Sequence, residues 1–199
     1  MLYVVWHYLC LGDPQAHYGL TPRQQLSAFV FAGKRDQARG NQWAAIDNLL
    51  ADAPCFAPFL GPRSADSLTI YSPNQLVMLA DGKRVTPTFQ VVAKEATNQA
   101  GRGPTSFAQI YDEAAHMVNA GTSRSAGEVY SAATPALAQF GNDSFIYQAS
   151  SPWTMGGKFY ESYVQALEVN PATGAARHPD MLTVQLPSDA MYDGWELTQ

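Results

Sequence analysis

Short apolar runs recur along this chain, and each one ends abruptly in polar or turn-forming residues. Runs of this kind are typical of strands that are buried on both faces of a parallel sheet. We therefore predict inner strands at the three clearest runs, which are Leu26 to Ala32, Phe107 to Tyr111 and Phe145 to Ala149.

Between these strands the apolar positions fall near a helical repeat. Residues 2 to 11 are predicted to be the end of a buried helix, which Gly12-Asp13-Pro14 terminates because proline cannot continue it. The other predicted helices run from Asp36 to Leu50, from Val129 to Phe140 with Pro135 near a start or a kink, and from Lys158 to Val169.

Weaker strand signals lie elsewhere in the chain. Leu68 to Tyr71, Gln75 to Leu79 and Thr88 to Val92 are predicted to be short antiparallel strands at the edge of the sheet, because turn residues separate them. Residues 51 to 66 are predicted to form a loop, and Met181 to Leu186 a last strand. This order of elements predicts an α/β fold, a three-layer sandwich with a mostly parallel central sheet and antiparallel edge strands.

Composition narrows the class of protein. With 46% hydrophobic and 15% charged residues, the 199 residues suit one globular domain or part of one. The net charge of -5 argues against a domain that binds nucleic acid through charge alone, so any DNA contact must be local. Cys10 and Cys55 lack disulfide or zinc-ligand spacing, which favours a reducing compartment. The apolar opening from Met1 to Leu11 lacks a basic leader and is too short to span a membrane.

One pair of acids stands out, because Asp112 and Glu113 are the only two adjacent acids in the sequence. They follow a predicted strand, and in α/β sheets ligands bind outside the carboxyl ends of the strands. In a nucleotide-hydrolysing sheet, the first acid would hold Mg²⁺ and the second would orient and deprotonate the attacking water. The alternative is an exposed pair that begins a helix, where the helix dipole favours negative charge by ~0.3–1 kcal/mol. Ser150 and Ser151 follow another predicted strand and would lie on the same rim.

Further residues near these acids also need an interpretation. Gln109 is polar inside a predicted strand, so it requires hydrogen-bond partners if it is buried. Arg102 lies in a glycine-flanked loop, where its guanidinium either reaches a phosphate of nucleotide or DNA or is only solvated. His116 either orients Glu113, contacts a neighbouring subunit or makes a local hydrogen bond, and Trp153 is assigned to packing.

Three blocks of sequence occur in a suggestive order: Phe29-Val-Phe-Ala-Gly-Lys-Arg-Asp-Gln-Ala38, Ile110-Tyr-Asp-Glu-Ala-Ala-His-Met117, and Ile146-Tyr-Gln-Ala-Ser-Ser-Pro152 followed by Gly157-Lys-Phe-Tyr-Glu161. Together they resemble the ATPase half of the large terminase subunit, the motor that packs DNA into the heads of tailed phages. The acid block is similar to that family's Walker B segment, and the third block to its coupling motif. A helicase box of the Asp-Glu-Ala-His type does not match, because a second alanine precedes His116.

The resemblance implies ATP and Mg²⁺ as cofactors. It implies Asp112 as a catalytic acid that binds the metal and Glu113 as the catalytic base, while Ser150 and Ser151 would sense the γ-phosphate. The partners that it implies are double-stranded DNA, the portal protein, the small terminase subunit and further copies of the same chain, without a membrane. The implied location is the host cytoplasm, transiently at the procapsid portal.

The chain departs from the family in lacking a phosphate-binding loop. Such a loop needs Gly-x-x-x-x-Gly-Lys-[Ser/Thr], and the three Gly-Lys pairs here are followed by Arg, Arg and Phe. In the family this loop immediately precedes a helix like residues 2 to 11, and a nuclease domain would follow Gln199. We therefore expect residues 1–199 to be a partial terminase ATPase domain, an ATPase in the full-length protein but inactive alone.

Two other functions stay open at this point. The chain could be a non-catalytic interaction module, or the remnant of a split gene that assembles with other motor components. It could also be a metal-dependent phosphoesterase that uses Asp112, but such an enzyme needs more convergent carboxylates than the motifs provide.

Overall fold

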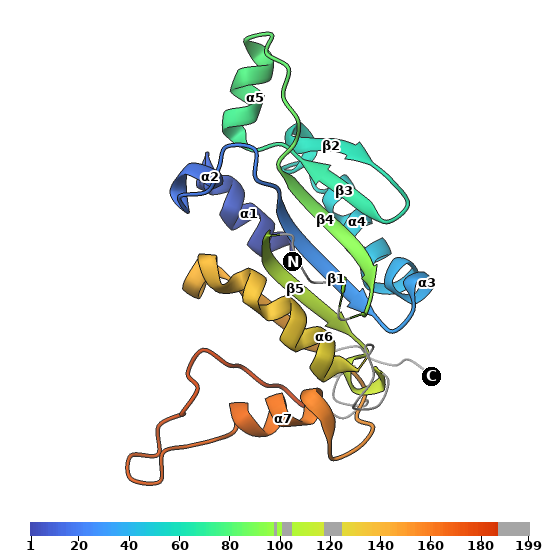
Figure 1. Cartoon of the computed structure of the whole chain (residues 1–199), viewed down its shortest axis with the longest axis vertical. Helices are drawn as coiled ribbons and strands as arrows, with labels where there is room; N and C mark the ends of the chain where they lie inside the picture. The colour runs from blue at the N-terminus through green and yellow to red at the C-terminus, as the bar shows by residue number, and fades with distance from the viewer. Residues whose placement is uncertain (98, 101–104, 118–124, 187–199) are drawn as a thin grey trace, which may run out of the picture.

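The computed structural model describes residues 1–97, 99–100, 105–117 and 125–186, which fold around one sheet (Figure 1). The strands are β1 (Leu26–Ala32), β2 (Leu60–Arg63), β3 (Ser67–Ile70), β4 (Phe89–Glu95), β5 (Thr105–Asp112) and β6 (Phe145–Ala149). The α-helices are α1 (Leu2–Cys10), α2 (Pro14–His17), α3 (Arg35–Ala38), α4 (Ala44–Asp52), α5 (Pro73–Ala80), α6 (Ala126–Ala133) and α7 (Gly157–Ala166). The remaining helical segments are the π-helical turn η1 (Arg39–Trp43) and the 3₁₀ segments η2 (Ala57–Phe59), η3 (Ala114–His116) and η4 (Thr134–Asp143).

The sheet is mixed and mostly parallel, in the order β2-β3-β4-β1-β5-β6. β4, β1, β5 and β6 are parallel, and β3 is antiparallel to both β4 and β2. The predicted α/β class is therefore confirmed. Because β4, β1, β5 and β6 run the same way, their carboxyl ends meet at one edge of the sheet, which is the edge that positions ligands in such folds.

Two strand positions differ from the prediction. β4, which covers the predicted strand from Thr88 to Val92, is an inner strand parallel to β1 and not an antiparallel edge strand. β6 lies at the edge of the sheet and not inside it. Both strands contain short apolar runs, although β4 is an inner strand and β6 is an edge strand. Hydrophobic patterning alone therefore does not distinguish the two positions.

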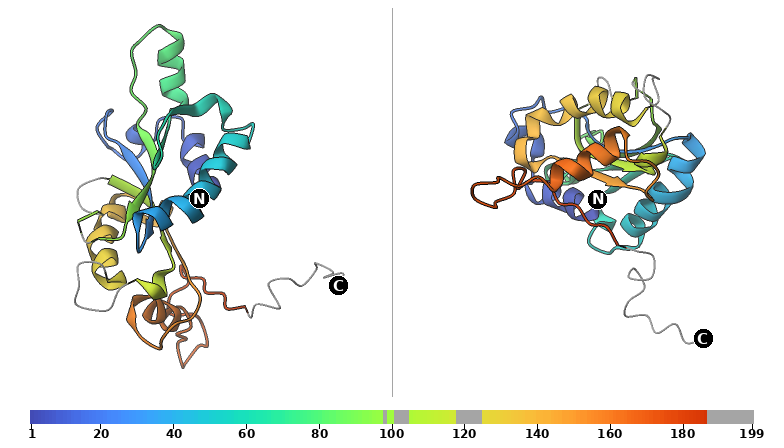
Figure 2. Two further views of the ribbon diagram at one scale, coloured as in Figure 1. Left: turned by 90° about the vertical axis from the view of Figure 1, so that its right-hand side faces the viewer. Right: turned by 90° about the horizontal axis from the view of Figure 1, so that it is seen from below.

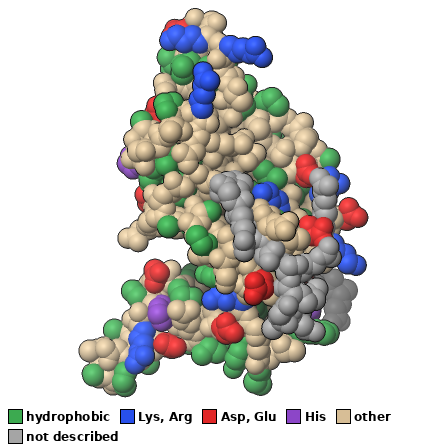
Figure 3. All heavy atoms as spheres, viewed as in Figure 1, with side chains coloured by type: hydrophobic (Ala, Val, Ile, Leu, Met, Phe, Trp, Pro, Cys, Tyr) green, Lys and Arg blue, Asp and Glu red, His purple; other side chains and the backbone are tan. Residues whose placement is uncertain are grey.

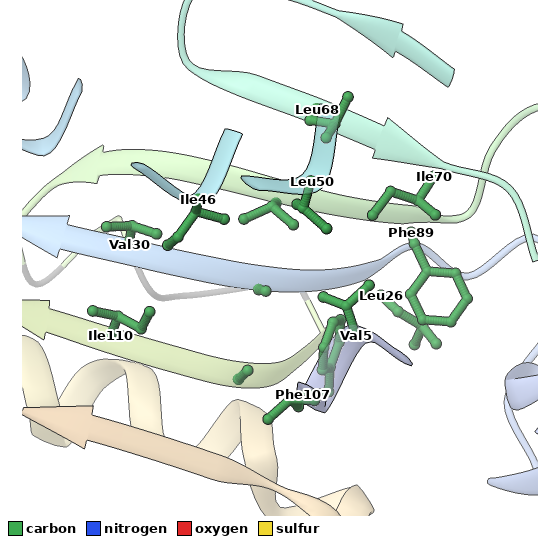
Figure 4. Packing of buried hydrophobic residues seen from close by; sticks show 14 of the residues in the cluster. Val5, Leu26, Val30, Ile46, Leu50, Leu68, Ile70, Phe89, Phe107 and Ile110 are labelled. Atoms are coloured by element: carbon green, nitrogen blue, oxygen red, sulfur yellow. The ribbon is translucent and has the colours of Figure 1, made fainter. Parts of the chain in front are cut away.

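Helices cover both faces of the sheet, and the sequence of β1 explains why. All seven residues of β1 are buried, as is typical of a parallel strand packed on two sides. Val30 belongs to the core cluster that includes residues of α1 and α4, such as Val5 and Leu50 (Figure 4). Phe31 belongs to the cluster on the other face, which includes residues of α6.

Gln109 is fully buried in β5, and both of its hydrogen-bond requirements are met. Its Nε2 donates to the carbonyl oxygen of Ala133 at 2.8 Å, and its Oε1 accepts from the hydroxyl of Tyr111 at 2.8 Å. Burial raises the pKa of Tyr111, so this hydroxyl stays protonated and remains a donor. The polar residue in the strand therefore connects β5 to the end of α6.

The predicted strand from Gln75 to Leu79 is wrong, because this segment is part of α5. The Ser72 Oγ accepts from the backbone N–H of Gln75 at 3.4 Å, and the Gln75 Oε1 accepts from the backbone N–H of Ser72 at 3.0 Å. This reciprocal capping box, with Pro73 in the first helical position, starts the helix. α5 projects from one end of the sheet (Figure 1).

We expect Ser72→Ala to destabilise the protein by about 1 kcal/mol, because one helix-start N–H loses its side-chain acceptor. Urea denaturation followed by circular dichroism measures this loss. Ser131→Ala on the exposed side of α6 is the matched control and should change the free energy of unfolding by less than about 0.5 kcal/mol. Equal losses in the two variants would show that the cap contributes nothing specific.

The secondary structure of two further segments was also predicted wrongly. Residues 51 to 66, predicted to be a loop, include the end of α4, η2 and the short strand β2. Met181 to Leu186, predicted to be a strand, has no strand beside it, and Leu182 is 91% exposed. A strand requires a hydrogen-bonded neighbour, and the apolar pattern cannot indicate whether one exists.

Among the described residues, no helix combines the length and the hydrophobicity needed to cross a bilayer.

Candidate functional site

The acid pair lies where β5 ends at the carboxyl edge of the sheet. Asp112 is the last residue of β5 and is 6% exposed, whereas Glu113 is partly exposed. Glu113 has a left-handed backbone, with φ 53° and ψ 42°, and is the only non-glycine residue with positive φ in the described part of the chain. This uncommon conformation turns the chain sharply out of the strand and into η3. The two neighbouring acids therefore occupy different surroundings.

One residue of the serine pair, Ser150, contacts one residue of the acid pair, Glu113. Asp112 is paired with Ala149 in the parallel register of β5 and β6, so the next residues of both strands lie side by side. The Ser150 Oγ donates to the Glu113 Oε2 at 3.2 Å and accepts from the backbone N–H of Ala115 at 3.1 Å. The structure thus brings the acids and the serines to one rim, as the strand order predicts.

His116 extends this network to Ser151. Its Nε2 lies 2.8 Å from the Ser151 Oγ and 3.7 Å from the Glu113 Oε2. The ring of Trp153 lies against the imidazole with 4.9 Å between the centroids. His116 therefore makes a hydrogen bond to a distant residue rather than a local one, and it also lies near Glu113. Trp153 is 70% exposed and covers a member of the site, so its assignment to packing was wrong.

Asp112 lies on the face of the sheet that α1 covers. Side chains alternate along a strand, and Ala108 and Ile110 both belong to the core cluster that includes residues of α1. Asp112 is two residues further along, so its carboxylate is on the same face. That carboxylate is consequently directed toward the side of the edge where α1 begins.

The direction of α1 follows from a contact at its other end. The Tyr8 hydroxyl donates to the carbonyl oxygen of Asp143 at 3.2 Å, and Asp143 lies just before β6 begins. The carboxyl end of α1 is thus at the amino edge of the sheet, and its amino end extends about 13 Å toward the carboxyl edge (Figure 1). The first turn of α1 contains no acid and no side-chain cap, so the partial positive charge at its amino end is not compensated by its own residues.

Two basic residues, Lys94 and Arg102, lie near this edge in the sequence, and the structure describes the surroundings of Lys94 only. The Lys94 Nζ donates to the carbonyl oxygen of Ala100 at 2.8 Å and lies 4.0 Å from the centre of the Phe29 ring. Burial lowers the pKa of Lys94. Lys94 is therefore held on the α6 side of the sheet. Arg102 lies outside the described residues, so its predicted contact with phosphate remains a prediction.

The oxygen atoms at this rim partly match the requirements of Mg²⁺. Carboxylates and hydroxyls are ligands that Mg²⁺ accepts, and Mg²⁺ commonly keeps several waters and takes one or two protein carboxylates together with phosphate oxygens. Asp112 supplies such a carboxylate. The described residues contain no group of three or more His, Cys, Asp and Glu side chains able to hold a metal. Among the described residues, Asp112 is therefore the one rim carboxylate that the sequence assigned to a metal, and no larger cluster of such ligands surrounds it.

Comparison with solved structures identifies the fold. A point mutant of the large terminase ATPase domain from Thermus phage P74-26 matches with a TM-score of 0.58 and 19% identity, covering 94% of this chain and 75% of that chain. The ATPase domain of the same phage terminase also matches, with a TM-score of 0.52 and 20% identity over 86% of this chain and 68% of that one. This chain has the fold of a large terminase ATPase domain.

The likeness to the terminase ATPase domain is one of fold. No protein-family model matches the sequence, and no curated protein matches it significantly. The resemblance suggested by three short blocks is thus supported across most of the chain by the arrangement of the elements. The roles of the individual rim residues depend on their own geometry and chemistry.

Proposed function

We propose that this chain forms part of the ATP-driven motor of a large terminase and that its β5–β6 rim hydrolyses ATP in the full-length protein. The observation that supports this most is the contact between Glu113 and Ser150, which joins the ends of two parallel strands in a terminase ATPase fold. Asp112, next to Glu113, faces the side of α1. We assign Asp112 and Glu113 the role of the Walker B acids, and Ser150 and Ser151 the role of the coupling motif.

The two acids take different roles because their surroundings differ. Asp112 lies at the rim and is largely buried, so its carboxylate would hold Mg²⁺, which would supply neutralisation of phosphate charge during phosphoryl transfer. Glu113 is partly exposed and accepts a hydrogen bond from a neutral hydroxyl. Its carboxylate can therefore orient a water and take its proton. Ser150 positions Glu113, and Ser151 with His116 completes the support on the β6 side.

The amino end of α1 is the expected side for phosphate, because free N–H groups and the helix dipole favour an anion there. The sequence of 199 residues contains no phosphate-binding loop motif. We infer that residues 1–199 are a partial ATPase domain of the P-loop type, a three-layer sandwich whose loop precedes α1 in the full-length protein. Alone, the chain is expected not to hydrolyse ATP at the rate of a motor.

The partners and location follow from the same proposal. Double-stranded DNA is the translocated substrate, and the portal protein, the small terminase subunit and further copies of the chain are the other components. Assembly occurs in the host cytoplasm, transiently at the procapsid portal.

The alternative function, a non-catalytic interaction module, is favoured by the missing loop motif alone. Calorimetric titration of ATP into the full-length protein separates the two, since the module should bind none.

We expect Ser150→Ala to lower kcat for ATP hydrolysis about tenfold in the full-length protein, since one hydrogen bond that positions the base is lost. The KM for ATP should change less than kcat, because the contact that the substitution removes is the one with Glu113. Ser162→Ala is the matched control, because that hydroxyl bonds Gln148 at 3.3 Å, away from the acids. A kcat as high in Ser150→Ala as in the control would contradict the positioning role.

A further inference from the structure

The two edges of the sheet differ in how they are protected. β2 at one edge contains Pro62 and Arg63, and its register with β3 is irregular. Proline, charge and irregular pairing are the features that prevent an edge strand from pairing with another chain. β6 at the other edge contains no proline and no charge, and its five residues pair with β5 without interruption. Within the described part of the chain no strand pairs with the outer side of β6, so a further strand can add there.

The same chain carries a segment with the pattern of such a strand. Leu182, Val184 and Leu186 alternate with Thr183 and Gln185, which is the pattern of a half-buried strand. Leu182 and Val184 are 91% and 69% exposed, so this apolar row is not covered by the described part of its own chain. The segment is uncharged, like β6, so no like charges oppose their pairing.

The connection between α7 and this segment has a structure of its own. The backbone N–H of Asn170 donates to the carbonyl oxygen of Ala175, and Val169 and Ala176 form an antiparallel bridge. Glu168 lies 3.8 Å from both Arg177 and His178. Met181–Leu186 follows this closed turn as an extended coil that is not paired with a strand of the described residues (Figure 2). Hydrophobic side chains gather on the same lower part of the molecule, around α7 and the turn (Figure 3).

We propose that Met181–Leu186 of one copy adds as a strand to the free edge of β6 in a second copy. Backbone hydrogen bonds along β6 provide the attachment, and the alternating apolar side chains provide specificity. Each copy carries one donor segment and one acceptor edge at different places on its surface. The contact is therefore head-to-tail, and it builds a ring or a chain rather than a symmetric pair.

Light scattering coupled to size exclusion tests this assembly with the chain as it is. We expect concentration-dependent self-association, weakened at least about tenfold by Val184→Lys in the donor and by Tyr147→Lys in the acceptor, because a charge on either strand opposes pairing. Both side chains are exposed in the single chain, so neither change disturbs its core. Met155→Lys is the matched control: it is 88% exposed but lies outside both strands, and it should leave the association unchanged.

Mixing the two defective variants provides the decisive readout. The Tyr147→Lys chain keeps its donor and the Val184→Lys chain keeps its acceptor, so together they should form a one-to-one complex that neither forms alone. A wild-type chain that stays monomeric at all concentrations overturns the proposal. So does a loss of association in Met155→Lys equal to that in the strand variants, or a mixture that stays monomeric, which would place the segment on its own β6 or on another protein.

Discussion

Glu113→Gln in the full-length protein is expected to reduce ATP turnover by about 10²–10⁴-fold, because glutamine keeps the shape of the side chain but cannot accept a proton from water. Nucleotide binding should stay largely intact, since Glu113 contacts Ser150 and His116 at the rim and does not bind the phosphates in the proposed mechanism. Steady-state ATPase assays measure the first quantity, and isothermal titration calorimetry with ATP measures the second.

Glu161→Gln is the matched control for this experiment. Glu161 is an exposed carboxylate on α7, so its neutralisation changes the net charge equally without reaching the rim. Turnover in the control should equal that of the wild type. Undiminished turnover in Glu113→Gln would reject Glu113 as the base, and a loss of ATP binding would assign it to the nucleotide pocket instead.

Gln109→Leu is expected to destabilise the protein by about 2–4 kcal/mol. The substitution leaves the buried carbonyl of Ala133 and the hydroxyl of Tyr111 without their present partner, and each unsatisfied buried group costs about 1–3 kcal/mol. Chemical denaturation of the chain measures the free energy of unfolding. The loss should appear even though leucine suits the apolar surroundings of β5.

A second substitution separates hydrogen bonding from packing. Adding Tyr111→Phe to Gln109→Leu removes the unsatisfied hydroxyl and should recover about 1 kcal/mol. Gln148→Leu on β6 is the control and should cost less than about 1 kcal/mol, because Gln148 is only partly buried. If the double variant is less stable than Gln109→Leu, the Tyr111 hydroxyl still has a favourable partner, such as Thr134, and its loss of Gln109 does not explain the destabilisation.

The bounds of two strands could be predicted from the sequence because their signal is local. β1 and β6 have the predicted bounds, Leu26–Ala32 and Phe145–Ala149, since each is a continuous apolar run closed by polar residues. The helix from Gly157 to Ala166 also lies within the predicted region, where the apolar positions follow a helical repeat. Where periodicity and end signals agree, the chain itself specifies the element.

The errors have two causes, a local helix-start signal that was overlooked and the choice of neighbouring strands. Gln75 to Leu79 is apolar enough for a strand, but the capping box at Ser72 and Gln75 starts a helix, and that signal was present in the sequence. The position of β4 beside β1 and the unpaired state of Met181 to Leu186 depend on which strands are neighbours. Neighbours are set by the whole fold and cannot be derived from one segment.

The site was predictable as a location but not as a network. The strand order places Glu113 beside Ser150, since both follow parallel neighbouring strands. The left-handed backbone of Glu113 and the contact of His116 with Trp153 have no signal in the sequence, because they depend on the turn that follows β5. The sequence motif thus indicates the acids, and the structure identifies Ser150 and His116 as the residues that contact Glu113.

The central claim is that the carboxyl edge at β5 and β6 holds a divalent cation through Asp112. Titration of Mn²⁺ as a paramagnetic substitute for Mg²⁺, followed by NMR of the chain, tests it most directly. Signal broadening should appear first at the backbone amides of Asp112–Ala115 and of Ser150 and Ser151, and Asp112→Asn should abolish it. Broadening centred on other carboxylates, or unchanged in Asp112→Asn, would contradict the account.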